Sequence, residues 1–104
     1  MNNSELFKIL NGVFPTCRND WSEIGKPPDP PYMAFMETGS DNFGADNKVY
    51  YKKKDFVVEL YIKKNDYESE EKLENALDEN EIYWEKGGQY YIKETKLVQI
   101  IYKI

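Results

Sequence analysis

The segment from residue 56 to residue 80 most constrains the fold. In it, a strand with apolar residues at alternate positions leads directly into a helix with apolar residues on one side. Apolar side chains occupy every second position of the strand: Phe56, Val58, Leu60 and Ile62. In a β-strand these positions share one face, so we expect that face to meet the core. A helix over residues 66–80 follows, with Asp66 as its N-cap and acidic residues in its first turns, where the helix dipole favours negative charge.

The remaining elements are expected on both sides of this segment. Periodicity and turn residues predict a short helix over 5–10, strands over 32–36 and 49–51, and a final hairpin of strands 82–86 and 89–104 joined at Gly87-Gly88. Residues 37–47 have loop composition, and Trp21 and Ile24 are expected to pin the proline-rich segment 16–31 to the body. The predicted class is α+β: one domain over 1–104, with an antiparallel (mixed) sheet of about five strands packed by two helices in the order α-β-β-β-α-β-β.

Composition restricts the classes of function. The chain has 104 residues and a formal net charge of −5, which argues against general binding to nucleic-acid phosphates. The single cysteine, Cys17, cannot form an intrachain disulfide, and the first residues show no secretion signal. The single cysteine fits synthesis in a reducing cytoplasm. No apolar run approaches the length of a membrane span, so we expect no membrane partner.

The residues that usually carry catalysis are scarce. There is no histidine, which removes the commonest general base and metal ligand, and we expect no enzyme activity, no metal and no cofactor. Arg18 beside Cys17 could lower the thiol pKa, but free cysteine is more often a buried structural residue. Glu70 and Glu74, one helical turn apart, could hold a cation, although a solvated helix face explains them more simply.

Two polar clusters leave alternatives open. Asp41, Asn42 and Asp46 offer oxygen ligands in a glycine-containing loop, but their spacing misses the calcium-loop pattern, and turn formation explains them more simply, without a ligand. The lysines of 52–54 and 63–64 are expected to cluster at one end of the sheet. There they could contact a phosphate backbone or, more simply, protect sheet edges against wrong pairing.

Aromatic residues exceed what so small a core can bury. The chain has nine tyrosines and two tryptophans, and aromatic side chains gathered on a surface mark protein contacts. They could also cover a thin sheet with their hydroxyl groups in water. The candidate subunit or partner contacts are Phe43, Tyr50, Tyr51, Tyr61, Tyr83, Trp84, Tyr90 and Tyr91.

The order of short segments along the chain resembles the small tail-completion and tail-terminator proteins of long-tailed bacteriophages and prophages of Gram-positive hosts. The resemblance covers roughly residues 3–104 and rests on order and spacing, with no single diagnostic motif. The segments that carry it are the Pro-Pro-Tyr-Met-Ala-Phe run at 30–35, then 42–50, 58–61, 63–66, 70–74, 82–86, 91–94 and 101–102.

This resemblance implies a structural virion protein, assembled in the host cytoplasm, with no catalytic residues. Such proteins form a ring, commonly sixfold, at the head-proximal end of the tail, where they end tube growth and join tail to head. The implied partners are other copies of the chain, the tail-tube protein and head connector proteins, with DNA only as a passing, repelled strand. We expect an acidic ring lumen from Asp41, Asp46, Glu68, Glu70, Glu71 and Glu74.

Three other functions compete with this interpretation. A head-side connector or stopper protein would have the same kind of sequence. An acidic soluble inhibitor would bind a basic protein as a stable monomer and would need carboxylates spaced like phosphates, which only residues 68–81 approach. A small enzyme is disfavoured, because no activated nucleophile or metal set is present.

Overall fold

The α+β class is confirmed by the computed structural model, which describes residues 1–40, 43–45, 48–51 and 54–104, with side chains for 1–40 and 54–104. The predicted order of two helices and five strands is confirmed, and β1 and β3 are additional short strands. In chain order the elements are α1 (Asn3–Asn11), β1 (Thr16–Arg18), the 3-10 turn η1 (Trp21–Glu23), β2 (Tyr32–Ser40), β3 (Phe43–Ala45), β4 (Lys48–Tyr51), β5 (Lys54–Lys63), α2 (Tyr67–Glu79), β6 (Glu85–Ile92) and β7 (Leu97–Lys103).

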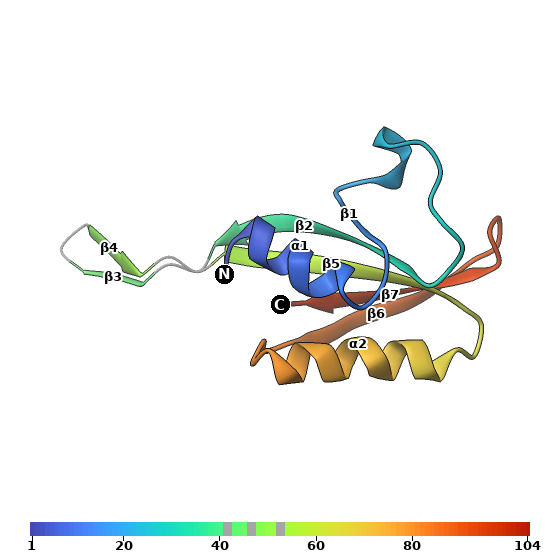
Figure 1. Cartoon of the computed structure of the whole chain (residues 1–104). Helices are drawn as coiled ribbons and strands as arrows, with labels where there is room; N and C mark the ends of the chain where they lie inside the picture. The colour runs from blue at the N-terminus through green and yellow to red at the C-terminus, as the bar shows by residue number, and fades with distance from the viewer. Residues whose placement is uncertain (41–42, 46–47, 52–53) are drawn as a thin grey trace.

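The main sheet has five strands in the order β1-β2-β5-β7-β6 (Figure 1). The short β1 runs parallel to β2, and all other neighbours are antiparallel, so the sheet is mixed. The alternating strand β5 lies at the centre, hydrogen-bonded to β2 on one side and to β7 on the other. Central placement explains why its apolar face is so regular, because both of its edges are paired and one face is fully covered.

Both helices cover the same face of this sheet. The predicted core positions of β5 are all buried, and they share one cluster with Leu6 and Leu10 of α1 and Leu73 and Leu77 of α2. The sheet contributes Met33, Phe35, Phe56, Val58, Leu60, Ile62, Val98, Ile100 and Tyr102 to that cluster. Alternation along β5 therefore leaves Val57, Glu59 and Tyr61 on the face opposite α1 and α2.

The helix boundaries agree with local capping chemistry. Asp66 caps α2 by accepting a hydrogen bond from the Ser69 backbone N–H at 3.2 Å, as predicted. At the N-terminus the cap is Asn2, which accepts from the backbone N–H of Glu5 at 2.8 Å, so α1 begins earlier than expected. Gly12 is the C-cap of α1 and keeps a right-handed helical conformation, with φ of −73° and ψ of −16°.

The predicted turn of the last hairpin was wrong. Gly87 and Gly88 lie inside β6, at an irregularity in its pairing with β7, and the chain reverses at residues 93–96 instead. The Tyr90 ring lies over Gly88, with atoms 2.8–3.0 Å from the position that a Cβ would occupy. A larger residue at position 88 would therefore require this ring to shift. The true turn contains no glycine, and Lys96 takes the positive φ of 58°.

Residues 37–40 continue β2 instead of opening the predicted loop, and β3 and β4 then form a separate antiparallel pair. Figure 1 shows this pair projecting beyond the end of β2 and β5 as an arm. The radius of gyration of 14.9 Å exceeds the roughly 13 Å typical of a compact chain of this length. We call residues 41–53, which include β3 and β4, the arm.

Candidate interaction surfaces

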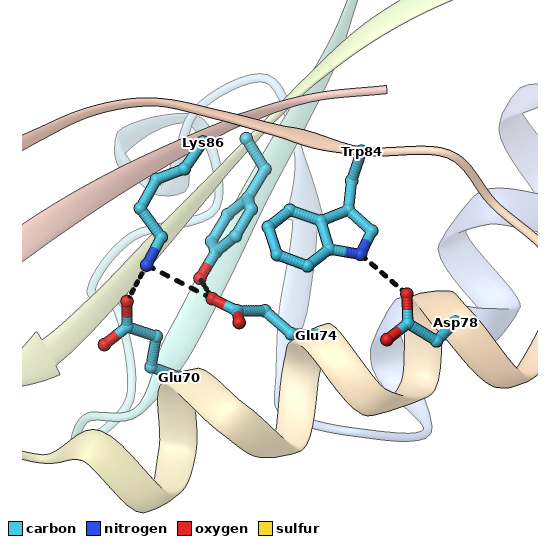
Figure 2. Close-up of polar contacts among 6 residues, drawn as sticks. Glu70, Glu74, Asp78, Trp84 and Lys86 are labelled. Atoms are coloured by element: carbon cyan, nitrogen blue, oxygen red, sulfur yellow. Dashed lines mark hydrogen bonds and ion pairs between the residues drawn. The ribbon is translucent and has the colours of Figure 1, made fainter.

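A cluster of polar side chains fastens α2 to the sheet. Lys86 of β6 donates a hydrogen bond to Glu70 and lies 3.3 Å from Glu74 Oε2 (Figure 2). The Tyr102 hydroxyl donates to the same Glu74 oxygen at 2.7 Å. Burial lowers the pKa of Lys86, but its bonds to the two carboxylates outweigh this and raise it. Burial and the neighbouring Glu74 also raise the pKa of Tyr102 well above its ordinary value.

The acidic residues assigned to a ring lumen are therefore not equivalent. Glu70 and Glu74 are partly buried and engaged with Lys86, whereas Glu68 and Glu71 lie exposed on α2. Asp41 and Asp46 lie outside the described residues, as does Asn42. The structure thus leaves Glu68 and Glu71 as the described members of this set whose carboxylates face solvent.

Three of the candidate contact residues are strongly exposed near the outer strand of the sheet. Tyr83 is 74%, Tyr90 54% and Tyr91 56% exposed. Tyr83 precedes β6, and its hydroxyl donates a hydrogen bond to Glu85 at 2.8 Å. Of the other candidates, Phe43, Tyr50 and Tyr51 belong to the arm, and their side chains lie outside the described part.

Trp84 and Tyr61 have structural partners. Trp84 packs edge-on against Tyr102 with ring centroids 5.6 Å apart, and its indole N–H donates to Asp78 of α2 at 2.8 Å (Figure 2). Tyr61 stacks on Tyr32, with centroids 4.9 Å apart and ring planes 13° from parallel. Both residues are partly buried. The aromatic excess in the sequence therefore reflects packing within the fold at these two residues, as well as exposed surface elsewhere.

Of the lysines expected in one cluster, Lys54 and Lys63 lie at opposite ends of β5, whereas Lys52 and Lys53 lie outside the described residues. Lys54 is its first residue and Lys63 its last, and ten residues of strand span about 30 Å. The strand predicted around Phe56 to Ile62 already separates these positions, so the expectation of one cluster was inconsistent with that strand. Lys54 lies 3.5 Å from Glu37 of the neighbouring β2, an exposed pair at the sheet edge.

A cleft of about 540 Å³ lies on the face of the sheet that the helices leave open. Its floor comes from β2 and β5, and one wall comes from the segment that links β1 to β2. Trp21 holds that segment in place by donating its indole N–H to the Met33 carbonyl at 2.9 Å, as expected of it. Ile24, expected to help, is instead 69% exposed. The lining includes Asp20, Trp21, Tyr32, Met36, Glu59 and Tyr61.

Glu59 is the polar centre of the cleft. Gln99 of β7 donates through one amide nitrogen to Glu59 Oε2 at 2.6 Å and to the Tyr61 hydroxyl at 3.0 Å. Burial raises the pKa of Glu59 despite that bond, and the nearby Asp20 adds to the rise. Burial and the charge of Glu59 raise the pKa of Tyr61 to about 12. The cleft is therefore a partly dehydrated, negatively charged site.

Cys17 lies next to this cleft and is inert. The side chain is 2% exposed, and burial, with the charges of Asp20 and Glu23, raises its pKa to about 11. The thiolate that Arg18 could have stabilised is therefore not favoured at neutral pH. The expectation of a buried structural thiol is confirmed.

Sequence reasoning missed the cleft because its residues come from three separate segments. Trp21, Tyr32 and Glu59 are far apart in the chain and meet only through the β1-β2-β5 pairing. The one available signal was Glu59, a carboxylate on an otherwise apolar central strand. Over the described residues, no group of three or more His, Cys, Asp or Glu side chains is placed to hold a metal ion.

The chain matches no protein-family model and no curated protein. No helix within the described ranges is long and apolar enough to cross a membrane.

Proposed function

We propose that this chain is a structural virion protein that forms a ring at the head-proximal end of a phage tail, ends tube growth and joins tail to head. The observation that carries the proposal is a pair of unlike surfaces on one subunit: the projecting arm and the outer edge of β6. The order and spacing of segments shared with tail-completion proteins support the same function. The protein would act without catalysis, as a component of the virion.

The outer edge of β6 is suited to pairing with another chain. In the described part of the structure, β6 has a strand neighbour on one side only, so its other edge presents backbone hydrogen-bonding groups. Tyr90 and Tyr91 lie exposed on this eight-residue strand. An edge with aromatic side chains offers both main-chain hydrogen bonds and apolar contact area.

The arm supplies a second, different surface. Among the described strands, β3 and β4 pair with each other and with no other strand, and they project beyond the ends of β2 and β5 (Figure 1). When one subunit contacts its neighbour through unlike surfaces, the contact repeats head to tail and closes into a ring if the rotation allows. Two standard contacts would bury about 1,600 Å² per subunit, out of a total of 7173 Å².

Of the acidic residues proposed to line the ring lumen, Glu68 and Glu71 are the described ones that are exposed. Glu68 and Glu71 are exposed on α2, so their charges can repel a passing phosphate backbone. Charge reversal, Glu68→Lys with Glu71→Lys, should reduce head-tail joining or DNA passage while the subunit stays folded, with an unfolding midpoint lowered by a few degrees because Glu68 lies in the first turn of α2. Unimpaired joining would contradict the lumen assignment.

The first test is the mass in solution by light scattering over a concentration series, alone and with purified tail tubes. We expect a species of about six subunits, or a monomer that is incorporated at one end of the tube. Replacing residues 41–53 by a short Gly-Ser linker should abolish either result while the circular dichroism spectrum keeps its helix and sheet signals.

A matched pair of variants tests the β6 edge. Tyr90→Ser with Tyr91→Ser should weaken ring formation, whereas Ile24→Ser should not, because Ile24 is 69% exposed in the β1–β2 connection, at the other edge of the sheet from β6. A chain that stays monomeric at every concentration and ignores tail tubes would contradict the proposed function.

A further inference from the structure

We propose that the cleft between β2, β5 and the β1-β2 connection binds the guanidinium group of an arginine side chain carried by a partner polypeptide. This inference does not depend on ring formation. It rests on the shape of the cleft, its aromatic walls and its uncompensated negative charge.

The cleft has the size and position of a binding site. Its volume of about 540 Å³ falls within the range of known ligand pockets. It lies on the face opposite α1 and α2, so a ligand can enter without disturbing the core. The wall segment is fixed by the Trp21 hydrogen bond and by the edge-on contact of Trp21 with Tyr32, with centroids 5.8 Å apart.

The aromatic walls suit a planar cation. Tyr61 and Trp21 both line the cleft and are only partly buried, so part of each ring remains available to a ligand. Tyr32 is buried beneath the stack with Tyr61, which holds the Tyr61 ring in one orientation. A guanidinium group stacks on such rings and is weakly hydrated. It therefore loses less hydration free energy than an ammonium group does when it enters a partly dehydrated cleft.

The charge in the cleft lacks a cation. Among the described residues, ion pairs form at Glu37, Glu70 and Glu74, and none includes Glu59 or Asp20. Glu59 has a hydrogen bond from Gln99 through one carboxylate oxygen, Oε2. A guanidinium donor satisfies a carboxylate in this setting better than water does, because charge-assisted hydrogen bonds are strongest where the local dielectric is low.

The lining of the cleft favours an arginine within a peptide over a free metabolite as its occupant. The lining includes apolar side chains, Pro27 and Met36, beside the charged ones, so a neighbouring stretch of chain has surface to lie on. The chain itself has one arginine, Arg18, which lies in β1 of the same subunit. We therefore assign the occupant to a different polypeptide that presents an arginine in an extended segment.

The test uses two short peptides, acetyl-Gly-Arg-Gly-amide and the same peptide with citrulline, which has the same shape without the charge. Binding is followed by nuclear magnetic resonance, through the Trp21 indole N–H and the amides of residues 59–61. We expect the arginine peptide to shift these signals in a saturable way and the citrulline peptide to bind about tenfold more weakly. Equal binding of both peptides, or no shift with arginine, would overturn the proposal.

Variants separate charge from shape. Glu59→Gln should weaken the arginine peptide about tenfold, while Glu71→Gln, the same change on the other side of the molecule, should leave binding unchanged. Tyr61→Phe should bind normally and Tyr61→Leu should not, because only the first retains a ring. Signals that move with protein concentration alone would show a second copy in the cleft and overturn the assignment to a partner.

Discussion

The two faces of the main sheet are built from the same strands but are covered in different ways. On one face, α1 and α2 enclose a continuous apolar core, and their rim is fastened by Lys86 between Glu70 and Glu74. On the other, a single irregular segment covers part of β2 and leaves a charged cleft over Glu59. The comparison shows one face serving stability and the other left available for contact.

The largest expected difference lies between two neighbouring valines of β5. Val58 is fully buried under the helices, whereas Val57 lies partly exposed on the open face. Val58→Ala should lower the free energy of unfolding by about 2–3 kcal/mol, and Val57→Ala by about 1 kcal/mol or less. Urea denaturation of the two variants measures this directly, and equal losses would break the contrast between the faces.

The next effect concerns the polar rim of the covered face. Lys86→Met removes the cation between two partly buried carboxylates, which then repel each other, and should cost about 1 kcal/mol. Lys93→Met, a change of the same kind in the exposed turn after β6, should stay within about 0.5 kcal/mol of the wild type. High salt should reduce the difference between the two variants, and a difference indifferent to salt would argue against an electrostatic cause.

A smaller effect of opposite sign is expected on the open face. Because burial raises the pKa of folded Glu59, its ionisation opposes folding, and stability falls as the pH rises through that raised value. Glu59→Gln should therefore raise the thermal midpoint at pH 7 by about 1–3 °C. The gain should disappear below the ordinary glutamate value of 4.5, where both states are protonated. A variant less stable than the wild type at pH 7 would refute this account.

The smallest effect is expected at the sheet edge. Tyr90→Ser should change the free energy of unfolding by no more than about 0.5 kcal/mol, because the ring is 54% exposed. Denaturation under conditions where the protein is monomeric isolates this contribution from any contact between subunits. A large loss of stability would place Tyr90 in the fold and weaken the case for β6 as a contact surface.

Elements with strong local signals were predicted well. The helix capped by Asp66 and the alternating strand β5 were both located from sequence, because capping and periodicity depend on residues a few positions apart. The final hairpin failed for the opposite reason. Gly87-Gly88 is a typical turn signal, yet the pairing of β5 with β7 from residue 97 onward placed the reversal at 93–96.

By itself, the sequence determined the α+β class, the order of the predicted elements, and which side of β5 faces the core. Only the tertiary structure decided where the last hairpin turns and that Glu59 meets Trp21 in a cleft. The physical reason is the separation along the chain over which each interaction acts. Periodicity and capping act within a few residues, whereas strand pairing brings together side chains that the linear chain holds dozens of positions apart.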